Sequence, residues 1–287
     1  MVQSRAGTIA SPRRRKRPKV RHYLQLVAHQ LSRVAAPNAL PDPQNLPVRV
    51  VSETDIASWL GDQTARRAFV NLGSSTSDYL PQAVSGADSF ALYAIARGIE
   101  ATNALEIGTH LGISTVHIAA GLSGAAAKLA TVDICDVNDP VAARYKRFGS
   151  SVSARERAAQ LGLEDRVHFV VSSSHTFLKR CRDSYDLIFI DGSHSEIPAY
   201  FDILYSLRRL RAGGVIVLHD VNDPDDPTTG LERRRQYGVY WALHRLRSEF
   251  PSLTTIRLRT APLPGVKEAV PTTLAIVSRA PSSVQTA

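Results

Sequence analysis

The chain has 287 residues, 44% of them hydrophobic, and a formal net charge of +9. Its size suits one large α/β domain with an N-terminal extension, and no apolar run approaches the ~20 residues that a membrane-spanning helix needs. Residues 1–21 contain eight basic residues and no acidic residue, which leaves a net charge of only +1 on the remainder. The main body is therefore nearly neutral, and its composition does not indicate nucleic-acid binding.

Residues 1–21 are expected to form a disordered basic tail, because Pro12 and Pro18 interrupt a run that is too highly charged to pack. An anionic membrane surface or an RNA could attract this tail, and a solvated leader without a partner is the alternative. No apolar stretch of about 7–15 residues follows the tail, so no export signal is predicted. With only Cys135 and Cys181 in the chain, reduced thiols and a cytoplasmic location are expected rather than a disulfide framework.

Residues 22–87 are predicted to be a helical extension with a Pro-rich linker at 37–47. Amphipathic spacing predicts helices over 22–35, from Ser52 to Leu60, and over 64–72. Asp88 is expected to cap a further helix, whose apolar stripe is formed by Leu92, Ile95, Ala96 and Ile99. These elements precede the first predicted strand of the sheet, so they are expected to form an N-terminal helical cap.

From residue 104 onward, short apolar runs alternate with helical patterns. Such runs, without polar positions in between, are typical of parallel strands that helices cover on both faces. Strands are predicted at 104–108, 128–134, 167–172, 185–190 and 214–219, and helices at 113–121, 151–161, 174–181 and 198–210. A helix at 239–250 and an antiparallel pair of strands at 254–259 and 272–278 follow. The prediction is a doubly wound, Rossmann-like α/β domain over 88–280. Its seven-stranded sheet is expected to contain five parallel strands and a closing antiparallel hairpin. Residues 281–287 are expected to be disordered.

The first predicted strand leads into a glycine-containing loop. An acidic residue, Glu106, is followed by Gly108 and Gly112, and the next helix begins near Ser114. The glycines allow a tight turn and the close approach of a ligand, and the helix N-terminus offers unpaired N–H groups. The spacing is E-x-G-x-x-x-G, which differs from the G-x-G-x-x-G of dinucleotide-binding proteins.

The run Leu105-Glu106-Ile107-Gly108-Thr109, with Gly112 and Ser114-Thr115, resembles motif I of class I S-adenosylmethionine-dependent methyltransferases. It is most similar to the O-methyltransferase branch that includes catechol O-methyltransferase. The resemblance extends over about residues 88–280 and implies S-adenosylmethionine as the cofactor. It also implies that the strand-end acid and the loop hold the methionine part of this cofactor, through Glu106, Gly108, Thr109, Gly112 and Ser114.

Two further strand ends are candidates for cofactor binding. Asp133 ends the second predicted strand, where a carboxylate can accept hydrogen bonds from both hydroxyls of a ribose; the alternative is a solvated strand-end acid. Ser173 and Ser174 follow the third strand, where members of the family commonly contact the adenine. Either serine could instead cap the following helix.

Asp191 and Asp220 follow the fourth and fifth predicted strands. Two carboxylates at adjacent strand ends repel one another unless a cation lies between them, and Mg²⁺ prefers oxygen ligands. The resemblance implies that both acids hold a divalent metal, which binds the substrate hydroxyl and lowers its pKa. It also makes Asp191 a candidate for cofactor binding and catalysis. Val221 occupies the position of the third ligand in the catechol enzymes, so Asn222 is predicted in its place, with His219 as the alternative.

His194 lies three residues after Asp191, where the catechol enzymes have a lysine as general base. An unperturbed pKa near ~6.5 suits a histidine to the same role. The segments 189–195 and 210–220 resemble a group of bacterial methyltransferases with the pattern "DG.HS…PGG…HD", several of which act on sugars or natural products. The alternative for His194 is a loop histidine bonded to the backbone.

The favoured prediction is an S-adenosylmethionine-dependent methyltransferase that acts on a hydroxyl of a small molecule or sugar, assisted by Mg²⁺ or another divalent cation. An RNA-associated methyltransferase and a non-catalytic Rossmann-like binding protein are the alternatives. The near-neutral body argues against nucleic acid as a substrate. The sequence does not identify the substrate, and a homo-oligomer is one of the possible assemblies.

Overall fold

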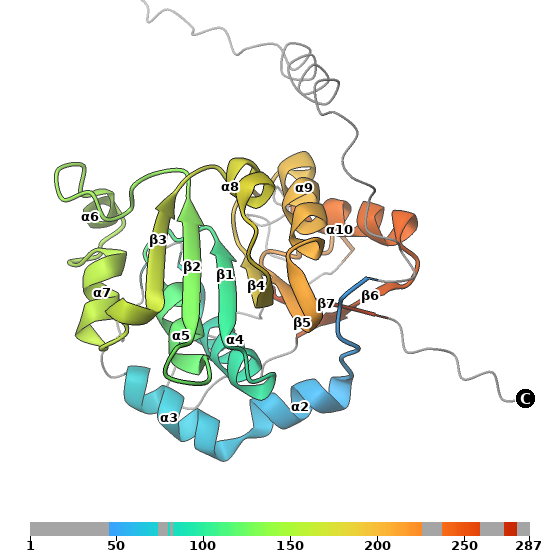
Figure 1. The fold of residues 1–287 in the computed structure, drawn as a ribbon, viewed down its shortest axis with the longest axis horizontal. Helices are drawn as coiled ribbons and strands as arrows, with labels where there is room; N and C mark the ends of the chain where they lie inside the picture. Colours follow the sequence, from blue (N-terminus) through green and yellow to red (C-terminus); the bar gives the residue numbers. More distant parts are fainter. Residues whose placement is uncertain (1–45, 74–79, 81–82, 226–236, 259–272, 280–287) are drawn as a thin grey trace, which may run out of the picture. The chain divides into compact units, whose positions relative to one another are not determined.

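The computed structural model describes residues 46–73, 80, 83–225, 237–258 and 273–279 (Figure 1). All of them belong to one compact unit, Pro43–Ala287. The predicted tail at 1–21, the predicted helix at 22–35 and the predicted disordered end at 281–287 lie outside the described residues. None of the described helices has the length and apolar character needed to cross a membrane.

Seven strands form one sheet in the order β3-β2-β1-β4-β5-β7-β6 (Figure 1). They are β1 (Asn103–Ile107), β2 (Lys128–Asp133), β3 (Val167–Val171), β4 (Tyr185–Ile190), β5 (Leu210–Leu218), β6 (Leu253–Arg257) and β7 (Ala275–Arg279). Neighbours among β1 to β5 pair in parallel, whereas β7 lies between β5 and β6 and is antiparallel to both. The predicted α/β sheet of five parallel strands with an antiparallel β6–β7 hairpin is confirmed.

Helices cover both faces of this sheet (Figure 1). The helices α4 (Gly86–Gly98), α5 (Ile113–Gly121) and α7 (Ala154–Gln160) share a core cluster with Leu187, Phe189, Val215 and Val217. The opposite cluster joins α8 (Ser174–Arg180), α9 (Glu196–Leu207) and α10 (Gly238–Glu249) to Ile188, Ile190, Ile216 and Leu218. Successive strand residues thus alternate between two apolar layers, which explains the unbroken apolar runs in the sequence. In open sheets of this kind, ligands bind outside the carboxyl ends of the parallel strands.

Two of the N-terminal helices begin at capping serines. Ser52 caps α2 (Glu53–Gly61) in a reciprocal pair with Asp55, and α3 (Gln63–Gly73) follows. The predicted role of Asp88 as a helix cap is wrong, because α4 starts earlier. Ser85 is the N-cap, and its hydroxyl accepts a hydrogen bond from the backbone N–H of Asp88. The carboxylate of Asp88 accepts a hydrogen bond from the hydroxyl of Ser85 at 2.8 Å, and the residue is only 4% exposed.

The main boundary error concerns β5, which begins at Leu210 rather than at 214, so that α9 ends at Leu207 rather than at 210. The β4–β5 register is irregular here, since Tyr185 pairs with Leu210 but Leu187 with Val215. Gly213, at φ +80°, permits the extra residues to bulge inside the strand. Two short elements, α6 (Arg144–Arg147) and the 3₁₀ turn Glu164–Arg166, were not predicted because they are too short to show periodicity.

His117 connects α5 to the N-terminal helix α3. Its imidazole is buried, with Nδ1 2.7 Å from the carbonyl oxygen of Ile113, and its ring centroid lies 5.0 Å from that of Phe69. Burial lowers the pKa of His117 to about 4, although the hydrogen bond to Ile113 opposes the shift. Because the folded-state pKa is depressed, the fold contains the neutral ring at pH 7 and must lose stability when acid protonates it.

Replacement of His117 by phenylalanine should therefore reduce the acid sensitivity of the fold. The wild-type free energy of unfolding should lose about 2.5 kcal/mol through this residue between pH 7.5 and 4.5, as pH falls from the unfolded-state pKa of about 6.5 towards the folded-state value. Urea titrations of wild type and His117→Phe at both pH values measure the difference. His168→Gln, which removes an exposed imidazole, is the control. Identical pH dependence in wild type and His117→Phe would contradict the assignment.

Candidate functional site

The loop after β1 is shaped by residues with positive φ: Gly108 at +98°, His110 at +45° and Gly112 at +74°. A Cβ on Gly108 would overlap the carbonyl oxygen of Asp191, at the end of β4. A Cβ on Gly112 would lie 2.6 Å from the Cβ of Ala154 in α7. Both glycines are thus required by close backbone packing, in addition to any ligand that approaches the loop.

Glu106 lies beneath this loop and is fully buried. Its carboxylate accepts hydrogen bonds from the hydroxyls of Ser114, Thr115 (2.5 Å) and Thr131 (2.6 Å). Burial raises the pKa of Glu106 to about 7, although the three hydroxyl donors oppose the shift. Thr109 is also buried, with its hydroxyl 2.6 Å from that of Thr131. The side chains of Glu106, Thr109 and Ser114 are therefore committed to a network that supports the loop.

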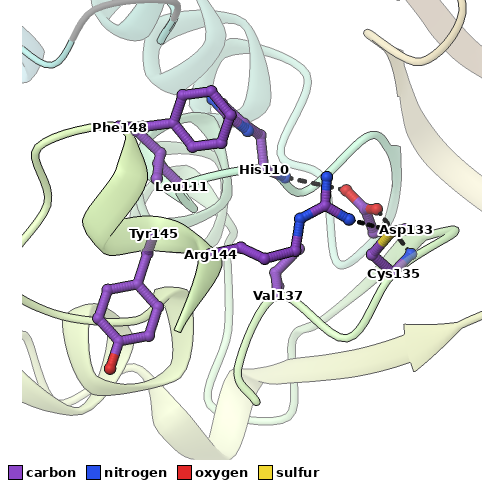
Figure 2. Close-up of a pocket in the computed structure, with 8 residues that line it drawn as sticks. All are labelled: His110, Leu111, Asp133, Cys135, Val137, Arg144, Tyr145 and Phe148. Atoms are coloured by element: carbon purple, nitrogen blue, oxygen red, sulfur yellow. Dashed lines mark hydrogen bonds between the residues drawn. The ribbon is translucent and has the colours of Figure 1, made fainter. Parts of the chain in front are cut away.

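Asp133 lines a pocket at the end of β2 (Figure 2). Its two carboxylate oxygens accept the backbone N–H groups of His110 (3.1 Å) and Cys135 (3.0 Å). Arg144 of α6 donates to the sulfur of Cys135, and the ring of His110 lies against Phe148 at 4.5 Å between centroids. We call this cavity the Asp133 pocket; its lining consists of His110, Leu111, Asp133, Cys135, Val137, Arg144, Tyr145 and Phe148.

Several residues of this region escaped the sequence prediction. Arg144, Tyr145 and Phe148 come from or adjoin α6, and the three-residue spacing of the two aromatic side chains was the available signal. Ile134, directly after Asp133, is 75% exposed, although it is apolar. Val171, which pairs with Asp133 across the sheet, is 59% exposed. Exposed apolar side chains beside a strand-end acid provide a surface for a flat, weakly polar ring system.

The two serines after β3 already have hydrogen-bond partners within the protein. Ser173 caps α8, since its hydroxyl accepts from the backbone N–H of Thr176 at 3.2 Å. Ser174 is hydrogen-bonded to the buried carboxyl of Asp202, whose pKa is raised by burial to about 6 against the effect of that bond. The predicted contact with an adenine remains a prediction for both residues.

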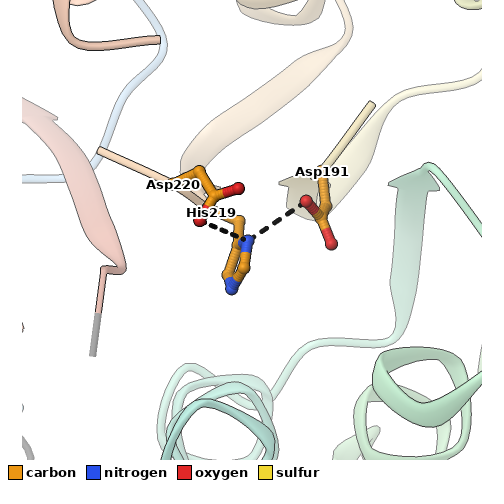
Figure 3. Close-up of side chains that lie close together, drawn as sticks. All are labelled: Asp191, His219 and Asp220. Carbon is orange, nitrogen blue, oxygen red and sulfur yellow. Dashed lines mark ion pairs between the residues drawn. The ribbon is translucent and has the colours of Figure 1, made fainter. Parts of the chain in front are cut away.

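Asp191 and Asp220 meet at the ends of β4 and β5, together with His219 (Figure 3). Nδ1 of His219 lies 3.1 Å from Oδ1 of Asp191 and 3.5 Å from Oδ1 of Asp220. Nε2 of His194 lies 3.2 Å from Oδ2 of Asp220 and 3.6 Å from Oδ1 of Asp191. The structure thus brings together Asp191, Asp220 and His194, and it places the alternative ligand His219 beside them. We call these four residues the acid–histidine cluster.

The charges in this cluster depend on one another. Burial disfavours ionisation of Asp191, but the positive charges of His219 and His194 outweigh it and lower its pKa to about 2. The hydrogen bond to Asp191 raises the pKa of His194; burial opposes this effect, and the charge of Asp220 adds to it. Burial likewise opposes protonation of His219, yet the surrounding carboxylates raise its pKa well above the usual range. The site therefore favours positive charge between two carboxylates.

The donor set is suited to a divalent cation. One ligand atom from each of Asp191, His219 and Asp220 lies within 4.8 Å of the others, and two carboxylates with an imidazole are common metal ligands. Asn222 is 3% exposed, and its backbone N–H donates to the carbonyl oxygen of Asp220 at 2.8 Å. Its side-chain nitrogen has no hydrogen-bond partner in the described part of the chain. The predicted role of Asn222 as a metal ligand stays a prediction.

Residues 105–221 match the family model described as "Methyltransferase domain". The chain is 32% identical over 164 residues to a catechol O-methyltransferase of Mycobacterium tuberculosis, and the match covers 56% of this chain and 67% of that protein. Cofactor-bound Rv0187 from MTB is 26% identical, with a TM-score of 0.50 and coverage of 78% of this chain and 93% of that one. The O-methyltransferase from Bacillus cereus in complex with SAH is 21% identical, with a TM-score of 0.50 and coverage of 76% and 92%, and supports the fold.

The chain spans between 45% and 67% of the length of the curated relatives that it matches. These relatives therefore extend beyond the matched segment. The segment covered by the family model contains the loop after β1, Asp133 and the whole acid–histidine cluster.

The overlap at Gly108 makes a specific substitution damaging. Gly108→Ala should lower the free energy of unfolding by about 2–5 kcal/mol, because left-handed strain of about 1–2 kcal/mol adds to overpacking of about 1–3 kcal/mol against Asp191. Gly124→Ala is the matched control, since Gly124 has φ +89° but no atom within 4 Å of an added Cβ. It should show only the strain. Urea unfolding measures the free energy of unfolding of both variants. Equal losses of this free energy in the two variants would contradict the role of the Gly108–Asp191 contact.

Proposed function

Because the chain belongs to the class I S-adenosylmethionine-dependent O-methyltransferases, we propose that it transfers the methyl group of S-adenosylmethionine to a hydroxyl of a small molecule or sugar. The supporting observation is the division of one sheet edge into two adjoining sites. The Asp133 pocket lies at the end of β2, and the acid–histidine cluster lies at the ends of β4 and β5. The loop at Gly108 connects them, since it follows β1 and packs on Asp191.

The cofactor is proposed to extend across β1 and β2. Asp133 would accept both ribose hydroxyls, which suits a carboxylate at the end of the second strand. The exposed side chains of Ile134 and Val171 offer an apolar surface for the adenine, with Ser173 and Ser174 close in sequence to the end of β3. The methionine part would lie along the backbone of Gly108, Gly112 and the N-terminus of α5, next to Asp191.

His194 is proposed as the general base. Its side chain is 38% exposed, so the imidazole is accessible from outside the protein. In the reaction, Nε2 accepts the hydroxyl proton while the substrate oxygen forms a bond to the methyl carbon. The carbon–sulfur bond breaks with its electron pair retained by sulfur, and S-adenosylhomocysteine leaves. Asp191 and Asp220 stabilise the imidazolium that forms, and alignment of oxygen, carbon and sulfur supplies much of the rate enhancement.

A divalent cation, when bound, would lower the pKa of the substrate hydroxyl. Asp191 and Asp220 would hold it, with Asn222 or His219 as a further ligand. Nε2 of His194 lies 3.2 Å from Oδ2 of Asp220 and 3.6 Å from Oδ1 of Asp191, so the proposed base adjoins both proposed metal ligands.

Calorimetric titration with S-adenosylmethionine tests the cofactor assignment. Asp133→Asn keeps the size of the side chain but removes a charged acceptor, so the dissociation constant should rise about 10–100-fold, which corresponds to the ~1.5–3 kcal/mol of a hydrogen bond to a charged group. Asp136→Asn is the matched control, because it removes an exposed carboxylate three residues further on. Absence of S-adenosylmethionine binding by the wild type would refute the proposed function, and binding without turnover of any hydroxyl would favour a non-catalytic binding protein.

Loss of the base should affect turnover and leave cofactor binding intact. His194→Gln should slow formation of S-adenosylhomocysteine by about 10²–10⁴-fold, while the dissociation constant of S-adenosylmethionine stays within twofold of wild type. Catechol is the first acceptor to assay, because a relative carries its name; a panel of phenols and sugars follows. His168→Gln, on the exposed side of β3, is the control. Unchanged turnover in His194→Gln would remove this histidine from the mechanism.

A further inference from the structure

We propose that His219 is the third metal ligand beside Asp191 and Asp220, that Asp88 orients it, and that the site consequently selects a first-row transition-metal ion over Mg²⁺. The inference rests on the proposed function, which places a divalent cation between the two acids. It decides between the two further ligands that the sequence leaves open, and it adds a positioning residue from the N-terminal helices.

The first observation is the direction of the His219 ring. Its Nδ1 is buried and lies 3.1 Å from Oδ1 of Asp191 and 3.5 Å from Oδ1 of Asp220, but it forms a well-directed hydrogen bond to neither. The nitrogen therefore points between the carboxylates rather than at one of them (Figure 3). A ring nitrogen directed at a point shared by two carboxylate oxygens has the placement of a metal ligand.

The second observation is the partner on the other side of the ring. Nε2 of His219 lies 3.5 Å from Oδ2 of Asp88, a residue of α4 that is 4% exposed. The hydroxyl of Ser85 donates to the same carboxylate oxygen at 2.8 Å and helps to fix it. A carboxylate on the far nitrogen keeps the proton there and leaves the near nitrogen free to bind a metal. Asp88 therefore acts through His219 as a positioning residue.

The third observation is the backbone of Asp220. Its φ of +54° lies in the left-handed region that residues with a Cβ seldom adopt. Thr273 stabilises this conformation from the segment before β7: its hydroxyl accepts the backbone N–H of Asp220 at 3.1 Å and lies 3.3 Å from Oδ1 of Asp220. A strained backbone conformation persists only where neighbouring groups hold it in place. Here the conformation of Asp220 directs its carboxylate towards His219 and Asp191.

The donor set then determines the choice of metal. Mg²⁺ is bound mainly through oxygen and keeps several waters. An imidazole favours later first-row ions such as Fe²⁺, Co²⁺, Ni²⁺ or Zn²⁺. Replacement of His219 by an oxygen ligand should therefore weaken the binding of a transition-metal ion more than the binding of Mg²⁺. If Asp191, Asp220 and Asn222 were the ligands, replacement of His219 would leave both affinities unchanged.

Titration of the full-length protein with Co²⁺, alone and in competition with Mg²⁺, tests the inference without turnover. In His219→Asn the amide oxygen takes the place of Nδ1, so the ratio of the Mg²⁺ to the Co²⁺ dissociation constants should fall at least about tenfold from wild type. Asp88→Asn should weaken Co²⁺ binding about tenfold or more. Asn222→Ala is the matched comparison and should leave the ratio within twofold.

Proton NMR of the Co²⁺-loaded protein provides a direct readout. The wild type should show a strongly shifted, exchangeable N–H signal from the far nitrogen of a ligated imidazole. This signal should disappear in His219→Asn, persist in Asn222→Ala, and exchange faster with solvent in Asp88→Asn. S-Adenosylmethionine titration of every variant separates the two proposals, because the cofactor should bind in each of them.

Several outcomes would overturn the inference. They are absence of Co²⁺ binding in a wild type that binds S-adenosylmethionine, an unchanged metal ratio in His219→Asn, and a shifted N–H signal that survives in that variant. Loss of Co²⁺ binding in Asn222→Ala, with His219→Asn unaffected, would transfer the ligand role to Asn222. Failure of S-adenosylmethionine to bind the wild type, with Co²⁺ binding as expected, would instead refute the proposed function alone.

Discussion

The site depends on one close contact between two backbone segments. Gly108 packs so tightly on the carbonyl group of Asp191 that no side chain fits between them, and the N–H of Asp191 donates to the carbonyl oxygen of Ile107 at 2.8 Å. The loop that is proposed to hold the cofactor and the strand end that carries the first acid are therefore one rigid unit. The contact fixes the proposed binding sites of the methyl donor and the hydroxyl relative to one another before either ligand binds, and such positioning lowers the entropic cost of a two-substrate reaction.

The molecule stabilises its buried carboxylates in two different ways. Glu106 is surrounded by hydroxyl donors, and burial shifts its pKa upward. Asp191 is surrounded by imidazoles, and its pKa shifts downward despite burial. Neutral hydroxyl donors satisfy a carboxylate without adding charge. A protonated histidine adds a positive charge, which is lost when the imidazole gives up its proton and which a metal cation can replace. The first arrangement suits a structural support, and the second suits a site where charge changes during a reaction.

Much of this architecture follows from the sequence, because strand ends of parallel sheets lie at one edge. Asp191 and Asp220 were predicted to meet on that basis, and the offset of His194 placed it beside them. The pairing of His219 with Asp88 escapes prediction, since these residues are 131 positions apart and the sequence predicts Asp88 to be a helix cap. The burial of Glu106 escaped it too: the motif shows where the acid lies in the chain, but only the fold shows that Ser114, Thr115 and Thr131 enclose it. Short elements such as α6 give no periodic signal, so the wall of the Asp133 pocket could not be foreseen.

The position of β7 has a consequence for the order in which the protein can be built during translation. The last strand along the chain lies between β5 and β6, and Thr273, just before it, holds Asp220 in its left-handed conformation. A nascent chain that has emerged only as far as α10 already contains the Gly108 loop, Asp133 and both acids. It lacks the strand that covers β5 and the hydroxyl that fixes Asp220. The acid–histidine cluster therefore depends on a contact that the chain can form only after Thr273 has been synthesised.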